Sequence, residues 1–233
     1  MKLFKKTSFR RLTGVIAAAL CISLAPVPSS VPVSFVKEAE AAVKEGFYQV
    51  KRSNGEYDYY YYVKGKKITN KWKKITDTAT KKSYWYYFGP KGRAYKAYEN
   101  TLSSMYLERF VTKKIGTRTY GFDEFGHRIK GAWFSTKINK LFFFDGNGIY
   151  NSSKTSKLRV YAKKGRKASY LIKALGKPKK REVKAGGCFD IGSSLDDGSR
   201  LVYYTYDHIT VVTSTDTSGK TETIHLVDAN YRQ

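Results

Sequence analysis

The sequence predicts a mainly β protein, an irregular solenoid of stacked β-hairpins followed by a small α+β domain in which a helix packs on an antiparallel sheet. Three observations lead to this fold class. The 233 residues include 20 Tyr and 13 Phe, which favour strands over helices. A unit built from an aromatic cluster and a glycine turn recurs as far as residue 150. A helical pattern followed by strand patterns then replaces it.

The first residues predict export. A basic run precedes an apolar stretch at residues 12–25, an order typical of a secretory signal. The stretch is about 14 residues long, short of the roughly 20 that a membrane-spanning helix needs. Ala39 and Ala41 predict cleavage near Ala42, so residues 1–41 form a signal peptide and no integral membrane span remains. Cys21 leaves a lipoprotein as the alternative, although Leu20 before it is larger than a lipid-attachment motif prefers. The basic residues are Lys2, Lys5, Lys6, Arg10 and Arg11.

The chain after the signal is strongly basic. The sequence has 44 Lys and Arg against 19 Asp and Glu, and residues 1–41 contain 6 and 2 of these, so 38 against 17 remain, a net charge of +21. Such a charge implies a polyanionic partner. For an exported protein this partner is teichoic acid, anionic lipid or acidic polysaccharide rather than nucleic acid. The alternative is that the lysines only keep an aromatic surface soluble.

One unit occurs four times, at residues 60–72, 85–98, 119–133 and 141–150. Each has an aromatic cluster, a polar turn that ends in glycine and, in most cases, a second short segment that ends in an aromatic residue. Aromatic residues suit strands and glycine supplies the positive φ of a tight turn, so each unit predicts a hairpin. Successive hairpins must stack, because one hairpin alone cannot bury both of its faces. The turn glycines are Gly65, Gly92, Gly126 and Gly148.

The units resemble the cell-wall-binding repeat of the choline-binding type, which reads roughly Trp-Tyr-Tyr-Phe-Asp-x-x-Gly-x-Met-x-x-Gly-Trp. The resemblance covers about residues 46–151, and it implies that residues 44–152 bind a wall polymer, whether teichoic acid, choline or another glycan. The second unit matches through Trp85, Tyr86, Tyr87, Phe88 and Gly92; the third through Tyr120, Phe122, Asp123, Gly126, Gly131 and Trp133; and the fourth through Phe142, Phe143, Phe144, Asp145 and Gly148.

Eight aromatic residues are candidate ligand-binding residues, and each could equally belong to the core between hairpins. Choline would need three aromatic residues from adjacent hairpins around its quaternary ammonium. The net charge of +21 favours an anionic wall polymer or carbohydrate over this cation. The candidates are Trp72, Trp85, Tyr98, Trp133, Tyr62, Tyr87, Tyr120 and Phe143.

The repeat is irregular. The turn glycines are 27, 34 and 22 residues apart, and residues 99–114 interrupt the pattern as a loop or as a strand pair without a turn signature. The second unit ends in Tyr98 where the first and third end in Trp72 and Trp133.

A second domain is predicted at residues 157–233. Leu171, Ile172 and Leu175 share a helical face within residues 168–175, and Gly176 predicts the end of that helix. Strands are expected at 201–206, 209–214 and 221–227. This order resembles the small domains of the SmpA/OmlA and β-lactamase-inhibitor-protein type over about residues 157–230. The resemblance implies a protein partner for this domain.

The sequence predicts a non-catalytic envelope-binding protein, with no catalytic residue, cofactor or metal site. One alternative is a wall-active cysteine hydrolase that uses Cys188 with His208 or His225 and Asp228. Another is a secreted adhesin that binds glycans of other cells. A glycosidase would need facing carboxylates, whereas the adjacent pairs Asp196–Asp197 and Asp123–Glu124 are expected to point apart in turns. The stretch around Asp196 and Asp197 is expected to be an exposed loop. His127 after the third turn is expected to be solvated.

Overall fold

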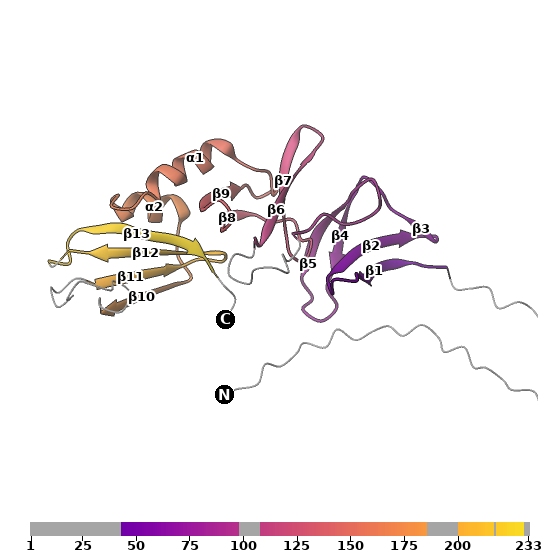
Figure 1. Ribbon diagram of the computed structural model, residues 1–233, viewed down its shortest axis with the longest axis horizontal. Helices are drawn as coiled ribbons and strands as arrows, with labels where there is room; N and C mark the ends of the chain where they lie inside the picture. Colours follow the sequence, from indigo (N-terminus) through magenta and orange to yellow (C-terminus); the bar gives the residue numbers. More distant parts are fainter. Residues whose placement is uncertain (1–42, 98–107, 186–199, 217, 231–233) are drawn as a thin grey trace, which may run out of the picture.

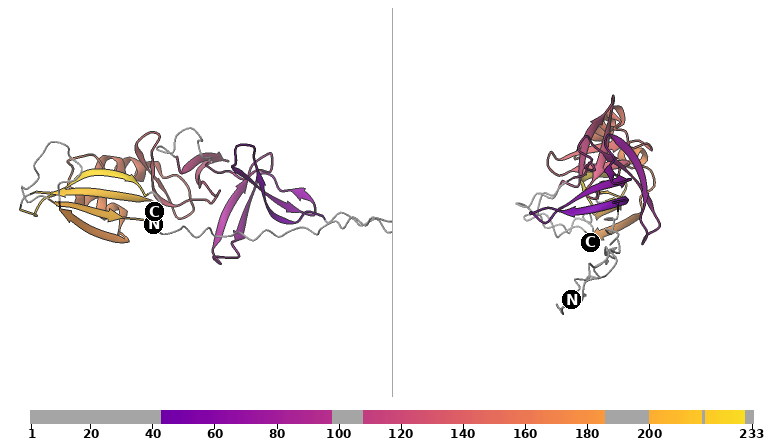
Figure 2. Two further views of the ribbon diagram at one scale, coloured as in Figure 1. Left: turned by 60° about the horizontal axis from the view of Figure 1, so that its bottom comes forward. Right: turned by 90° about the vertical axis from the view of Figure 1, so that its right-hand side faces the viewer.

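The computed structural model describes residues 43–97, 108–185, 200–216 and 218–230. Over these residues the protein is mainly β, with small antiparallel sheets arranged along an elongated molecule (Figure 1). The N-terminal hairpins lie at one end and the C-terminal sheet with its two helices at the other. Figure 2 shows the same succession from a second side.

The described residues between 46 and 144 form three hairpins and a three-stranded sheet. The sheet contains β1 (Gly46–Lys51), β2 (Tyr57–Val63) and the short β3 (Lys66–Lys67). The hairpins are β4 (Lys71–Thr76) with β5 (Ser83–Phe88), β6 (Phe110–Ile115) with β7 (Arg118–Asp123), and β8 (Gly131–Ser135) with β9 (Lys140–Phe144).

The predicted strand pairing within each unit is present but short in three of the four units, and the longer ladders have a different partner. The long ladders join each aromatic cluster to the segment before it, as in β4–β5, and not to the segment after its glycine turn. After the later turns only single bridges form, Phe88 with Ala94, Phe122 with Arg128 and Phe144 with Tyr150. Alternation along a strand specifies which face is buried but not which neighbouring strand completes the hairpin, and so the sequence pattern left the partner open.

The turns themselves follow the prediction. All four predicted glycines have a positive φ, between 70° and 79°. In the third and fourth units the turn is also held by an aspartate. Asp145 Oδ1 accepts hydrogen bonds from the backbone N–H groups of Asn147 and Ile149 at 2.8 and 2.9 Å. In the third unit, Asp123 Oδ1 accepts hydrogen bonds from the backbone N–H groups of Phe125 and His127 at 2.9 and 2.8 Å.

Consecutive hairpins are joined by a recurring backbone hydrogen bond. Two residues after each of Gly92, Gly126 and Gly148, a backbone N–H donates to a carbonyl of the preceding sheet or hairpin, at 2.8–2.9 Å. The donors and acceptors are Ala94 and Tyr59, Arg128 and Trp85, and Tyr150 and Thr119. The array therefore repeats in three dimensions even where its sequence spacing varies.

The C-terminal module begins with α1 (Ser152–Tyr161) and α2 (Ala168–Leu175). Its four-stranded antiparallel sheet has the order β10–β11–β12–β13. The strands are β10 (Lys180–Ala185), β11 (Arg200–Thr205), β12 (Ile209–Thr215) and β13 (Glu222–Ala229). The predicted helix and the three predicted strands are confirmed. Helix α1 and the edge strand β10 were not predicted.

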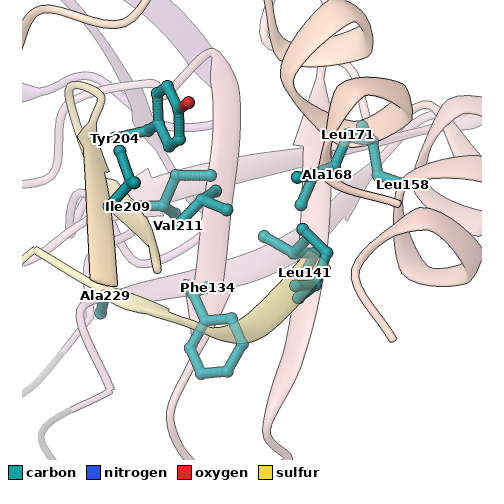
Figure 3. Close-up of a cluster of buried hydrophobic side chains, with 11 residues drawn as sticks. Phe134, Leu141, Leu158, Ala168, Leu171, Tyr204, Ile209, Val211 and Ala229 are labelled. Carbon is teal, nitrogen blue, oxygen red and sulfur yellow. The ribbon is translucent and has the colours of Figure 1, made fainter. Parts of the chain in front are cut away.

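The largest core cluster crosses the predicted boundary near residue 152. Phe134 of β8 and Leu141 of β9 pack with Leu158 and Leu171 of the two helices and with the inner face of the sheet (Figure 3). The fourth hairpin therefore shares its core with the C-terminal module. Within the described residues, no helix is both long enough and apolar enough to cross a membrane.

Candidate ligand-binding site

The aromatic run of β5 divides between two faces, because successive side chains of a strand point to opposite sides. Tyr86 and Phe88 belong to a core shared with the first sheet. Trp85 and Tyr87 lie on the other face, where Trp72 of β4 is paired directly with Tyr87. Period-two alternation thus places three predicted aromatic residues on one side of the second hairpin.

A fourth predicted aromatic residue reaches this face from the next hairpin. The ring centroid of Trp72 lies 5.1 Å from that of Tyr87 and 4.9 Å from that of Tyr120 on β7. Phe122, two residues further along β7, stacks on Trp72 at 5.8 Å. Adjacent hairpins therefore bring Trp72, Tyr87 and Tyr120 into one aromatic cluster.

A cation covers this aromatic surface. The guanidinium carbon of Arg128 lies 5.7 Å from the ring centroid of Trp72 and 5.6 Å from that of Trp85. The backbone N–H of Arg128 donates to the Trp85 carbonyl, which fixes where the side chain begins. Its aliphatic stem packs against Gly148, where a Cβ would lie 2.6 Å from Arg128 Cγ. We call Trp72, Trp85, Tyr87, Tyr120 and Arg128 the Arg128 cluster.

The Arg128 cluster has a buried floor and an accessible rim. Tyr87 is 9% exposed, whereas Trp85 is 38% exposed and the other three members are half-buried. Burial lowers the pKa of the Arg128 guanidinium, and the nearby Tyr120 opposes that shift. An arginine nevertheless keeps its proton in proteins, so the rim carries a positive charge.

This arrangement can hold a sugar that carries an anionic group. Aromatic faces provide apolar contact area for the C–H face of a sugar ring. A guanidinium binds carboxylate or phosphate through two parallel hydrogen bonds. A quaternary ammonium, in contrast, would have to take the place of Arg128 on the two indole rings and would be repelled by its charge.

Four candidates remain, and the three that the structure describes lie outside this cluster. Tyr62 packs edge-on against Tyr48 at 5.2 Å, with Lys44 Nζ 5.5 Å from its ring centroid. Phe143 lies beneath Lys154 Nζ at 3.9 Å. Tyr98 lies outside the described residues.

Trp133 is a core residue in this structure. It is 6% exposed, and its ring stacks on His208 at 3.8 Å and meets Phe110 at 5.7 Å. Its indole N–H donates to the carbonyl of Lys130 at 3.1 Å. The family-like position of this tryptophan thus contributes to packing between the hairpin and the C-terminal module.

The carboxylates of the pair Asp123–Glu124 have different partners. Asp123 caps its own turn, while Glu124 pairs with Arg109 at 3.3 Å. In the part of the chain that the structure describes, no three His, Cys, Asp or Glu side chains form a metal-binding group. Cys188, Asp196 and Asp197 lie outside the described residues.

The expectation that His127 is solvated is wrong. Its ring stacks on Tyr84 with centroids 3.8 Å apart, and Nδ1 lies 3.1 Å from Asp123 Oδ2. The side chain is only 20% exposed. His127 therefore joins its turn to the face of β5 opposite Trp85.

Sequence reasoning did not select Arg128, the one cation of the cluster. A signal was present, because Arg128 stands two residues after Gly126, as Ala94 and Tyr150 stand after their turn glycines. That position bonds to the preceding hairpin each time. To recognise the role of this position, one would have to know which hairpins contact each other, and the sequence did not specify those contacts.

No family model matches the chain, and no curated protein matches it. Among solved structures, the chain is similar to the modular Cpl-1 endolysin complexed with a peptidoglycan analogue. A mutant complex with a tetrasaccharide-pentapeptide aligns with 79% of this chain and 39% of that chain, at 14% identity and a TM-score of 0.32. The wild-type endolysin aligns with 49% of this chain over 40% of its own length, at 15% identity and a TM-score of 0.23. The chain spans about two fifths of the length of these structures, and TM-scores this low do not establish a common fold or function.

Proposed function

We propose that the protein is an exported, non-catalytic, envelope-binding protein whose hairpins form an irregular solenoid that attaches to a wall polymer. The observation that carries this proposal is the Arg128 cluster, in which aromatic residues from adjacent hairpins surround an accessible guanidinium. The predicted signal peptide and the basic composition support the same location. The assignment of a protein partner to the C-terminal module stays a prediction.

The ligand we propose for the cluster is a wall saccharide with an anionic substituent. Trp85 is the most exposed ring of the cluster and offers a stacking face, while Arg128 offers a charge-assisted hydrogen-bond donor beside it. Choline is the less favourable ligand because Arg128 already lies over both indole rings. A wall glycan therefore fits the chemistry better than a free quaternary ammonium.

Retention on purified cell walls tests the proposal. The full chain without residues 1–41 is compared with its Trp85→Ala and Arg128→Gln variants, at low and high salt and with free choline. Each substitution is expected to lower wall affinity by about tenfold, since a buried charge-assisted contact or a stacking face contributes about 1–2 kcal/mol. Matched controls are Tyr57→Ala, which removes another exposed aromatic ring, and Arg118→Gln, which removes another exposed cation.

The outcomes separate the candidate ligands. Loss of retention in the two cluster variants but not in the controls supports the proposal. Release of the native protein by free choline would contradict an anionic ligand and indicate a choline site. Full retention by both cluster variants would remove the Arg128 cluster as the attachment site.

A further inference from the structure

The positive charge of the chain is concentrated in one segment. Residues 152–185 contain 13 Lys and Arg against a single acidic residue, Glu182, a net charge of +12. Residues 186–233 contain 3 Lys and Arg against 7 Asp and Glu, a net charge of −4. The longer stretch 43–151 contains 22 Lys and Arg against 9 Asp and Glu, a net charge of +13. Lysines that serve only solubility need no such separation from acidic residues.

The basic segment has an exposed surface built from α1, α2 and the loop between them. Within α1, α2 and this loop, six cations are exposed. None of the six forms an ion pair with an acidic side chain among the described residues. We call these six residues the helical basic surface. They are Lys157, Lys163, Lys164, Arg166, Lys167 and Lys173.

The nearby acidic groups of the C-terminal sheet are engaged elsewhere. Asp207 pairs with Lys179, and Asp216 accepts a hydrogen bond from the backbone N–H of Lys220 within its own turn. Glu222 accepts a hydrogen bond from the hydroxyl of Tyr204 at 3.0 Å. Among the described residues, none of these carboxylates forms an ion pair with the helical basic surface.

The loop that carries four of the six cations has a fixed backbone. Gly165 N–H donates to the Ile224 carbonyl, and Ile224 N–H donates to the Arg166 carbonyl, each at 2.8 Å. Lys167 also forms a bridge with Thr223 of β13. The side chains project from a backbone that is already ordered, which lowers the entropic cost of binding a ligand.

The apolar side of α2 is directed to the core rather than to solvent. Leu171 is fully buried, and Ile172 and Leu175 pack against the same cluster. A helix that binds a membrane surface presents its apolar face to the lipid. On α1 and α2 the large apolar side chains that are exposed are Val160 and Tyr170, and the Tyr170 ring stacks on Tyr161 at 5.7 Å. Dense positive charge without an apolar anchor matches a flexible polyanion better than a bilayer.

We propose that the helical basic surface binds the phosphate groups of a linear anionic polymer of the teichoic acid class, as a second attachment site beside the Arg128 cluster. The inference rests on the proposed function, because the envelope supplies this polymer. The contact is electrostatic and weakens with salt. Two sites on one chain that engage the same wall raise the overall affinity above that of either site.

The test measures binding of the full chain without residues 1–41 to purified glycerol-phosphate teichoic acid. The variant combines Lys163→Gln, Lys164→Gln, Arg166→Gln and Lys167→Gln. It is expected to lose about tenfold or more in affinity at low salt, with a shallower salt dependence than the native protein. A charge-matched control combines Lys51→Gln, Lys66→Gln, Lys91→Gln and Lys114→Gln, all exposed lysines of the hairpin array, and should lose less than about threefold.

A second variant exchanges Lys for Arg and Arg for Lys at the same four loop positions and should bind as the native protein does. Equal losses in the loop variant and the charge-matched control would overturn the proposal in favour of net charge alone. Native affinity in the loop variant would overturn it as well. So would stronger binding to vesicles of equimolar phosphatidylglycerol and phosphatidylcholine than to the polymer, which would indicate a membrane partner.

The Arg128→Gln variant separates this inference from the proposed function. On walls stripped of teichoic acid, only the Arg128 cluster is expected to matter. If Arg128→Gln binds such walls normally, the proposed function fails. If the loop variant alone binds the free polymer normally, only the present inference fails.

Discussion

At the scale of single residues, glycines place the functional side chains. The stem of Arg128 occupies the space that a Cβ at Gly148 would fill. Gly89 stands where the later units have Asp123 and Asp145, because a Cβ there would come within 2.8 Å of the Tyr95 ring. A departure from the family-like pattern at this position therefore has a steric reason.

The substitution Gly148→Ala tests this placement. A Cβ would collide with Arg128, and the φ of 72° is unfavourable for alanine, so we expect a stability loss of about 1–3 kcal/mol. Denaturant unfolding measures the loss, and Trp fluorescence reports movement of the guanidinium from the two indole rings. Gly146→Ala is the matched control, since nothing lies within 4 Å of a Cβ at that position and its φ is not positive. Equal stability of the two variants would contradict this account.

At the scale of elements, each glycine turn is a small hydrogen-bonded unit. The Asp145 carboxylate holds two backbone N–H groups of its turn, beside the turn's own bond from Gly148 N–H to the Asp145 carbonyl at 2.9 Å. The turn also leads directly into Tyr150, which bonds to the preceding hairpin. A loosened turn is thus expected to weaken the junction between the third and fourth hairpins.

Asp145→Ala is expected to destabilise the protein by about 1–2 kcal/mol, because two backbone donors lose a charged acceptor. Asp145→Asn keeps an acceptor oxygen and should cost less than half as much. Thermal unfolding of both variants, with hydrogen exchange at the N–H of Tyr150, measures the effect. Identical unfolding of the alanine and asparagine variants would show that the side-chain oxygen does not hold the turn.

Elements with a strong local signal could be predicted from the sequence. The turn glycines require a positive φ, and the apolar face of α2 repeats at helical spacing, so both were found. Helix α1 was missed because Leu158 is its one fully buried apolar residue, and its other buried residue, Thr155, accepts a hydrogen bond from the Phe143 N–H of β9. Strand β10 was missed because Val183 is the one large apolar residue in a charged edge strand.

The aromatic residues of the candidate site were predictable from the sequence, whereas Arg128 and the grouping of these residues were not. Trp72, Trp85, Tyr87 and Tyr120 stand out in the sequence as aromatic repeats. Which of them meet depends on the pairing of β4 with β5 and on the contact with the next hairpin, both of which are long-range choices. Trp133 matches the family pattern equally well, yet it lies in the core because the C-terminal module covers it with His208.

At the scale of the whole molecule, the hairpin array and the C-terminal module share one core. Phe134 and Leu141 would lose their partners if the chain ended at residue 151, since they pack with Leu158, Leu171 and the sheet. We expect this shortened chain to bind a hydrophobic dye and to self-associate, whereas the full chain does not. Dye fluorescence and size-exclusion chromatography measure both effects. A monomeric fragment without dye binding would show that the fourth hairpin does not depend on the shared core.

The shared core also determines how the molecule carries mechanical load. A pull applied between the fourth hairpin and the C-terminal module passes through packed side chains of β8, β9 and the helices. Strand β9 is also joined to α1 through Thr155, whose hydroxyl accepts the N–H of Phe143 at 3.0 Å. Tension across this junction is therefore resisted by packed side chains of the shared core.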